Sequence, residues 1–387
     1  MQPLDYYHVE DELAPEDLAL RDRIRAFLRA EVQPEITRAL RQGDYLFESM
    51  KEALGEQGVF GPHLSGYGCP GLGSSAYGLV MQELERVDSG LRSMASVQGS
   101  LAMGAIHKHG SEEQKRRWLP ELRSGRALAS FALTERRHGS DPGGMETVAV
   151  LDGGHYVLNG NKRWIGNGSI ADVRVVWAKD EQGYVGGYLV EGSPSGFRAE
   201  DIAGKQSLTL SRTSELWFED CRIPAENRLP GAKGLRAALA CLNEARFGIS
   251  WGVIGAAQDC YQCALDYVVA REQFGKPLAG FQLVQEKLAQ MMTDITLAQT
   301  LALQLARLRD RGEATPQRIS LAKRNNVAMA LRCARTAREM LGGAGITDEY
   351  PIFRHMTNLE TVYTYEGTHD IHTLILGHDA TGLAAFS

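Results

Sequence analysis

The chain is poor in cysteine, with six among its 387 residues. They are scattered from Cys69 to Cys333, which favours free thiols in a reducing compartment over a disulfide framework. Cys260 and Cys263 have the spacing of half a zinc or redox motif, but no second pair accompanies them and the surrounding pattern is helical. We therefore expect these two side chains to be buried helix thiols.

The sequence also lacks an excess of positive charge and any uninterrupted apolar run of membrane-spanning length. A formal net charge of −6 argues against nucleic acid or an anionic membrane as the main partner. It does not exclude a local basic pocket that binds phosphates. The most apolar window, 237–257, is interrupted by Glu244 and Arg246. Residues 1–18 are acidic and show no signal-peptide pattern. We expect a cytoplasmic, bacterial-type protein with no integral membrane segment.

Several familiar site motifs are absent or incomplete. Residues 66–71 match Gly-x-Gly-x-x-Gly, but helical patterns flank them and Pro70 lies inside, so we interpret them as a loop and not a dinucleotide-binding turn. His369, Asp370 and His372 lack further ligands at suitable spacing, so no metal site is expected. The sequence contains neither a Gly-x-Ser-x-Gly turn nor a phosphate-binding P-loop.

What the chain does contain is a change of periodicity along its length. Apolar residues recur at helical spacing in the first third, β-branched and aromatic runs follow from Ala129, and helical spacing returns from Leu235. A chain of 387 residues with 43% hydrophobic content exceeds one typical domain. We predict an α+β, mainly α protein with a helical domain at 1–128, a small β domain at 129–234 and a helical bundle at 235–387.

Two local patterns strengthen the helical assignments. Ser111 followed by Gln114 is typical of a capped helix start. Residues 282–311 would span about 45 Å as one helix, and they carry one apolar stripe, which predicts packing in the core. The stripe consists of Val284, Leu288, Met291, Ile295, Ala298, Leu305 and Leu308.

The most informative segment lies near the C-terminus, where Tyr365 and Glu366 stand directly before Gly367 and Thr368. Glycine lets a backbone approach a ligand closely because it has no Cβ. A carboxylate in such a turn is a candidate general base, since burial tunes Glu to accept a proton near neutral pH. The alternative is a solvated Glu in a turn between helices, and this segment alone favours neither.

Five segments in order resemble the acyl-CoA dehydrogenase family of flavoenzymes. They are 131–141, which resembles the first flavin-contacting strand and loop; 162–167, the second; 271–282, which reaches a neighbouring subunit's flavin; 341–346, a loop for the FAD diphosphate and adenosine; and the turn at 365–368. Together they cover nearly the whole chain.

The resemblance implies a helical N-terminal domain, a small β-barrel-like domain and a C-terminal four-helix bundle. It also implies FAD as cofactor, Glu366 as catalytic base, an electron-transfer flavoprotein as electron acceptor, and a homotetramer. The cofactor-binding positions that it implies are Phe131, Leu133, Thr134, Gly139, Ser140, Trp164, Ile165, Gly166, Arg271, Phe274, Gln282, Glu339, Leu341, Gly342, Gly343, Thr368, Asp370 and Phe386.

Within that family, residues 83–93 and 365–377 are most similar to the members that act on glutaryl-CoA. A dicarboxylic acyl chain buries a charge at the far end of its pocket, and Arg pairs a carboxylate at two points. For Arg92 a helix-end charge is the alternative. The implied substrate-binding positions are Glu85, Arg92, Ser93, Ser96, Ser140, Asn243, Arg246, Tyr365 and Gly367.

The chain departs from the family pattern at several places. Arg136 replaces a usual proline and Arg137 follows it; we expect both to face solvent, with pairing to CoA phosphates as the alternative. Most relatives have Thr at the position of Gly166, whereas certain acyl-CoA oxidases also have Gly there. Three other functions therefore stay open: a dehydrogenase for another carboxylated or short-chain acyl-CoA, an acyl-CoA oxidase, and a helical scaffold without catalysis.

Overall fold

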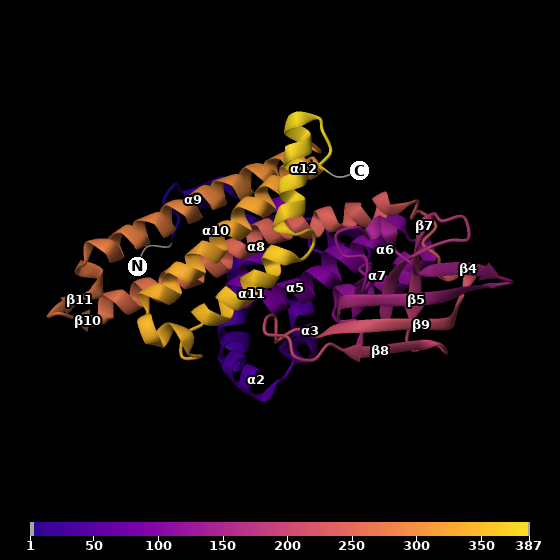
Figure 1. Cartoon of the computed structure of the whole chain (residues 1–387), viewed down its shortest axis with the longest axis horizontal. Coiled ribbons are helices and arrows are strands. Elements are labelled where there is room, and N and C mark those ends of the chain that lie inside the picture. Colours follow the sequence, from indigo (N-terminus) through magenta and orange to yellow (C-terminus); the bar gives the residue numbers. More distant parts are fainter. Residues whose placement is uncertain (1–3, 386–387) are drawn as a thin grey trace.

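The computed structural model describes residues 4–385, so Phe386 lies outside the described residues. Helices dominate, and one sheet lies at one end of an elongated molecule (Figure 1). The prediction of an α+β, mainly α fold is confirmed. Among the described helices, none is both long and apolar enough to cross a membrane.

The N-terminal part is a group of helices, of which α4, α5 and α6 pack along the long helix α8 (Leu235–Ala270). Ser111 and Gln114 form the predicted reciprocal cap at the start of α7. The segment at 66–71 belongs to a short hairpin whose strands, β1 (Ser65–Gly66) and β2 (Cys69–Pro70), have two residues each. It connects two helices, in agreement with its interpretation as a loop. The helices are α1 (Pro15–Phe27), α2 (Ile36–Gln42), α3 (Leu46–Glu56), α4 (Ser74–Val87), α5 (Ser89–Ser96), α6 (Met103–His109) and α7 (Glu112–Arg123).

The central part is a seven-stranded mixed sheet with the order β3-β6-β4-β5-β9-β8, and β7 pairs with β6. The β3–β6 pair is parallel, whereas β4–β5, β5–β9, β8–β9 and β6–β7 are antiparallel. The sheet has its own small core around Tyr188 and Phe218. The strands are β3 (Ala129–Ala132), β4 (Val148–Asp152), β5 (His155–Gly166), β6 (Val173–Lys179), β7 (Val185–Glu191), β8 (Phe197–Asp201) and β9 (Thr213–Pro224).

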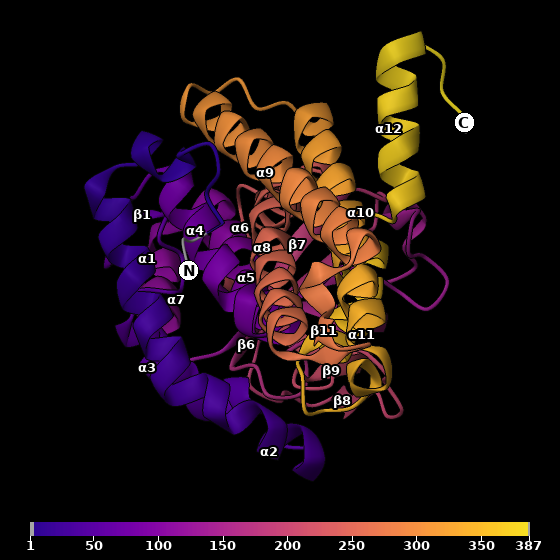
Figure 2. The same cartoon turned by 90° about the vertical axis from the view of Figure 1, so that its left-hand side faces the viewer.

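The C-terminal part is a bundle in which α8, α9 (Gln282–Asp310) and α10 (Pro316–Met340) run side by side, with α11 (Ile352–Thr364) packed against α10. Helix α9 begins where the apolar stripe predicts and buries Met291, Ile295, Ala298 and Leu305. Figure 2 shows α12 (His369–Thr381) projecting beside this bundle. The turn between α11 and α12 holds residues 365–368.

The six cysteines are free thiols, as expected. Cys260 is buried on α8, and Cys263 is half-buried on the same helix. Burial raises the pKa of the Cys263 thiol to about 12. This thiol therefore stays protonated and unreactive at neutral pH.

Candidate active site

The turn between α11 and α12 holds Glu366 in an uncommon backbone conformation. Glu366 has φ 53° and Gly367 has φ 91°, so two successive residues occupy the left-handed side of conformational space. A Cβ at position 367 would come within 2.9 Å of His372 Nε2. Thr368 then caps α12, because its hydroxyl accepts a hydrogen bond from the Ile371 N–H at 3.1 Å. Strain of this kind persists where the surroundings over-determine the backbone.

Three successive carbonyls of this turn accept hydrogen bonds from buried cations. Lys323 Nζ, on α10, donates to Tyr365 O and to Gly367 O, both at 2.6 Å. Arg246 Nε, on α8, donates to Glu366 O at 2.7 Å, and Arg246 Nη1 donates to Asn243 Oδ1 at 3.2 Å. Of these residues, Lys323 is not among the site residues predicted from the sequence.

The Glu366 carboxylate is half-buried, and its Oε2 atom has no hydrogen-bond partner among residues 4–385. Burial raises the pKa of Glu366 above its ordinary value, while the positive charges of Arg92, Lys323 and Arg246 oppose that shift. A carboxylate with a raised pKa and a free oxygen has the properties of a general base.

Beside this turn lies a buried ion pair between α4 and α5. Arg92 Nε donates to Glu85 Oε2 at 2.8 Å, and both side chains are fully buried. Arg92 Nη2 donates to the hydroxyl of Tyr365. Burial works against the charge of Arg92, but Glu85, Tyr365 and Glu366 together raise the pKa of the guanidinium, which stays charged. Arg92 is the fourth of the eight residues of α5 and pairs with Glu85, so it does not lie at the end of its helix.

One atom on each side of this pair lacks a hydrogen-bond partner within the described part of the chain: Arg92 Nη1 and Glu85 Oε1. A buried, unpaired guanidinium nitrogen is costly unless a ligand supplies an acceptor. Helix α8 makes room for the pair through Gly252, because a Cβ there would collide with Glu85 Oε2. Ser93 and Ser96 are buried on the same helix as Arg92, and the Ser96 hydroxyl bonds to Ser100 Oγ at 2.9 Å.

The two segments with flavin-type motifs lie next to each other at the inner end of the sheet. The Arg163 N–H donates to Thr134 O at 2.8 Å, which joins the end of β3 to β5. The β5–β9 register shifts between Lys162 and Ile165, and within this bulge Trp164 has φ 63° and is 55% exposed. An exposed indole beside open backbone fits a flat aromatic ligand. Phe131, Leu133 and Ile165, from the same two segments, are buried.

A second buried ion pair joins these same two segments. Glu135 accepts a hydrogen bond from Lys162 Nζ at 2.8 Å, and Thr147 donates to it through its N–H at 3.0 Å and its hydroxyl at 2.6 Å. Burial lowers the pKa of Lys162 to about 8, and Glu135 opposes that shift. The pair therefore holds the loop after β3 against the bulge that exposes Trp164.

Replacing Lys162 with Met should lower the free energy of unfolding by about 3–5 kcal/mol, because it leaves a buried carboxylate without its cation. Thermal melting and flavin content of the purified variant measure the effect. Lys162→Met combined with Glu135→Gln should recover part of the loss, whereas the exposed control Lys233→Met should melt like wild type. Equal melting temperatures for Lys162→Met and Lys233→Met would contradict a stabilising role for the pair.

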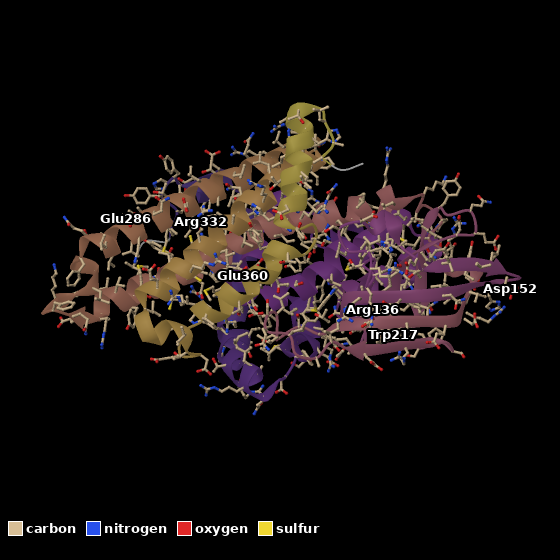
Figure 3. The ribbon with its side chains drawn as sticks, in the orientation of Figure 1. Arg136, Asp152, Trp217, Glu286, Arg332 and Glu360 are labelled. Carbon is tan, nitrogen blue, oxygen red and sulfur yellow. The ribbon has the colours of Figure 1, made fainter. Side chains whose placement is uncertain are left out.

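The structure also accounts for the departures from the family pattern. Arg136 and Arg137 have exposed side chains, as expected, and each meets a carboxylate, Glu215 for Arg136 and Glu146 for Arg137. Figure 3 shows Arg136 at the end of the sheet nearer the helices, away from Asp152 at its far tip. A Cβ on Gly166 would come within 2.8 Å of Met94 Cε, so Met94 fills the space that a larger residue would need.

Other predicted cofactor positions lie at the opposite end of the same chain. Arg271, Phe274 and Gln282 lie at or next to the β10–β11 hairpin (Glu272–Gln273 and Lys276–Pro277), far from the sheet (Figure 1). Phe274 is 93% exposed. These three residues therefore lie far from Trp164 of their own chain. This separation is consistent with the expectation that they contact the flavin of a neighbouring subunit. Also outside the site are Glu339, which pairs with Lys287, buried Leu341, and exposed Gly342 and Gly343.

The remaining predicted positions are solvent-facing or adjoin the turn. Gly139 and Ser140 are exposed in the loop after β3, and Asp370 is exposed in the first turn of α12. Glu135, His138 and Glu146 are spaced to hold a metal ion. Glu135 is already bonded to Lys162 and Thr147, so this group carries no metal assignment.

Comparison with known proteins decides the family. Models of the acyl-CoA dehydrogenase N-terminal, middle and C-terminal domains match residues 14–126, 130–221 and 232–380. The chain belongs to the acyl-CoA dehydrogenase family. A short-chain-specific acyl-CoA dehydrogenase of Megasphaera elsdenii is 34% identical over 362 residues, which cover 91% of this chain and 94% of that protein.

Two solved structures of this family match the whole chain. A glutaryl-CoA dehydrogenase from Mycobacterium smegmatis superposes with a TM-score of 0.97 at 48% identity, and the match covers 100% of both chains. A second glutaryl-CoA dehydrogenase of that organism, in complex with FADH2, has a TM-score of 0.97 at 45% identity, covering 100% of this chain and 99% of the other.

Proposed function

We propose that this acyl-CoA dehydrogenase oxidises a carboxylated acyl-CoA with FAD, and that glutaryl-CoA is its substrate. The observation that carries the substrate is the buried Arg92, whose Nη1 atom lacks a partner among the described residues. A terminal substrate carboxylate would supply that partner in a charge-assisted hydrogen bond. The similarity to two glutaryl-CoA dehydrogenases supports the same choice.

FAD fits the exposed face around Trp164, Thr134 and Gly166, and one of the similar structures holds its reduced form. Bound there, it would supply the hydride acceptor for the β-carbon of the substrate. The residues of the chain hold and orient the acyl thioester. Glu366 removes the α-proton, and its backbone N–H would donate to the thioester carbonyl oxygen, where negative charge develops.

With glutaryl-CoA the dehydrogenated product is glutaconyl-CoA, whose γ-carboxylate can leave as CO₂. The bond between the γ-carbon and the carboxyl carbon breaks, and its electron pair becomes a dienolate on the thioester. Protonation of that dienolate gives crotonyl-CoA. Glu366, which carries the proton taken from the α-carbon, is placed to return it, while Arg92 orients the leaving carboxylate between Glu85 and Tyr365.

The same pocket suits a second candidate, a dehydrogenase for another carboxylated acyl-CoA that does not lose CO₂. Arg92 and Glu85 would bind its carboxylate in the same manner. The coenzyme A portion would leave the site past Asn243 and Arg246, beside Ser140. Arg246 is already committed to the turn through Glu366 O, so it would contribute its remaining donors.

We propose assembly as a homotetramer, which the separation of the cofactor segments within one chain supports. Phe274, at 93% exposed, and Leu283, at 76% exposed, are large apolar side chains left open to solvent in and just after the β10–β11 segment. A neighbouring copy would cover them and would receive Arg271 and the loop at 342–343 against its own flavin. Electrons would leave to an electron-transfer flavoprotein, the acceptor that the family resemblance implies.

Mixing the yellow holoenzyme anaerobically with glutaryl-CoA tests this proposal. Flavin absorbance should fall and CO₂ should appear in step with it, whereas butyryl-CoA should reduce the flavin more slowly and release none. Bleaching without CO₂ would replace glutaryl-CoA dehydrogenation with the non-decarboxylating alternative. Peroxide formation on admitting oxygen would favour an oxidase, and a flavin that no acyl-CoA bleaches would overturn the proposal.

A further inference from the structure

Lys323 is a buried lysine that lies under the catalytic turn. It occupies the inner face of α10 and is 1% exposed, in phase with the buried Ile319, Asn326 and Ala330. Its Nζ atom contacts the two carbonyls that flank Glu366, those of Tyr365 and Gly367, each at 2.6 Å. Among residues 4–385 no carboxylate lies at ion-pair distance from it, although burying a charge without a counter-ion is costly.

Glu366 is the acidic group whose charge acts on this ammonium. Burial lowers the pKa of Lys323 to about 7; the Glu366 carboxylate opposes that shift, whereas Arg246 and Arg92 add to it. The charge of Lys323 in turn lowers the pKa of Glu366, against the effect of burial. A lysine in this position can act on Glu366 in two ways. Its hydrogen bonds hold the backbone of the turn, and its positive charge favours the ionised carboxylate.

The other charged groups around Glu366 are committed elsewhere. Arg92, from α5, is paired with Glu85 of α4, and Arg246, from α8, donates to a carbonyl and to Asn243. His372, from α12, meets Ser320 at 3.0 Å, and burial lowers the pKa of its ring to about 3, so it is neutral at working pH. The ring of His369, which stacks on Tyr363, likewise has a pKa below its ordinary value because of burial.

We propose that Lys323 is a positioning residue for the reaction: it fixes the left-handed turn that aims Glu366 and supplies the positive charge that keeps Glu366 ionised as the base. When the terminal carboxylate of a dicarboxylic substrate occupies Arg92, the charge of that guanidinium is largely neutralised. Lys323 and Arg246 then remain to favour the ionised base, and of these two Lys323 contacts the carbonyls on both sides of Glu366. This inference rests on the proposed role of Glu366.

The test compares three substitutions on one helix: Lys323→Met, Lys323→Gln and Arg324→Met. The rate of flavin reduction by glutaryl-CoA is measured anaerobically against pH in each. Removing a cation from beside a carboxylate raises the carboxylate pKa, typically by about 1–3 units. We therefore expect the rising limb of the profile to move about one to two pH units upward in both Lys323 variants, which lowers the rate below that limb about 10–100-fold.

The two Lys323 variants separate charge from geometry. The amide of Lys323→Gln can still donate to a carbonyl, so its plateau rate at high pH should stay closer to wild type than that of Lys323→Met. Arg324→Met is the matched control, because it removes a neighbouring cation whose Nε bonds to Thr373 Oγ1 at 2.8 Å. The rising limb of its pH profile should stay at the wild-type pH. Flavin content and thermal melting establish that each variant is folded.

A lowered plateau with an unmoved limb in both Lys323 variants would overturn the inference, because a purely structural residue would behave in that way. Glu366→Gln, measured in parallel, distinguishes the two possible failures. If Glu366→Gln bleaches like wild type, the proposed function fails. If it does not bleach and the Lys323 limbs still stay in place, only the inference about Lys323 fails.

Discussion

Replacing Glu366 with Gln should leave a yellow protein that binds acyl-CoA and does not bleach. The amide keeps the size and the backbone turn of the wild-type side chain but cannot accept the α-proton. General-base catalysis of this kind is commonly worth about 10²–10⁴-fold, and we expect a loss of at least that size in the rate of flavin reduction. Stopped-flow absorbance of the flavin under anaerobic conditions measures it.

Glu360→Gln is the matched control for this prediction. Glu360 lies six residues before Glu366, near the end of α11 (Figure 3). The exposed Glu360 side chain pairs with Arg335. Its variant loses the same charge outside the site and should bleach at the wild-type rate. If Glu366→Gln also bleached fully and as fast as wild type, another group would have to be the base.

Replacing Arg92 with Gln should change substrate preference more than overall activity. Glutaryl-CoA would then bury a carboxylate without a cation, and the loss of one partner from a buried charge pair costs about 2–5 kcal/mol. We expect kcat/KM for glutaryl-CoA to fall about 10²–10³-fold further than that for butyryl-CoA, which has no terminal charge. Steady-state rates with both substrates and an artificial electron acceptor give the ratio.

General destabilisation is the alternative explanation for a loss in this variant, since Glu85 would keep a buried charge alone. Arg174→Gln controls for it, because Arg174 is equally buried in the sheet and bonds to Gly168 O at 2.7 Å, outside the proposed pocket. That variant should affect both substrates alike. Equal losses of kcat/KM on glutaryl-CoA and butyryl-CoA in Arg92→Gln would contradict the proposal that Arg92 binds the terminal carboxylate.

Periodicity predicts most of this fold because each long helix carries its own signal. The apolar stripe of α9 and the cap at Ser111 are local patterns, and the structure confirms both. The proximity of Arg92 and Tyr365, 273 positions apart, carries no local signal and was predicted only through the family resemblance. Local spacing specifies elements, whereas the site depends on contacts between them.

Lys323 shows what the sequence could not predict. A lysine in a helix is usually exposed, and only the packing of α10 against α8 and α11 buries this one. The signal was its position in phase with Ile319 and Ala330, a charged residue on an apolar face. Arg136 is a similar case: its partner, Glu215, lies on a strand 79 residues later, so the sequence alone does not indicate the pair.

The most direct measurement is a crystal structure of the Glu366→Gln holoenzyme with unreacted glutaryl-CoA, since that variant should retain its substrate. We expect the α-carbon to face the side chain at position 366, the flavin to lie on the opposite side of the acyl chain, and the terminal carboxylate to bond to Arg92. A thioester bound elsewhere, or a carboxylate turned towards solvent, would contradict it.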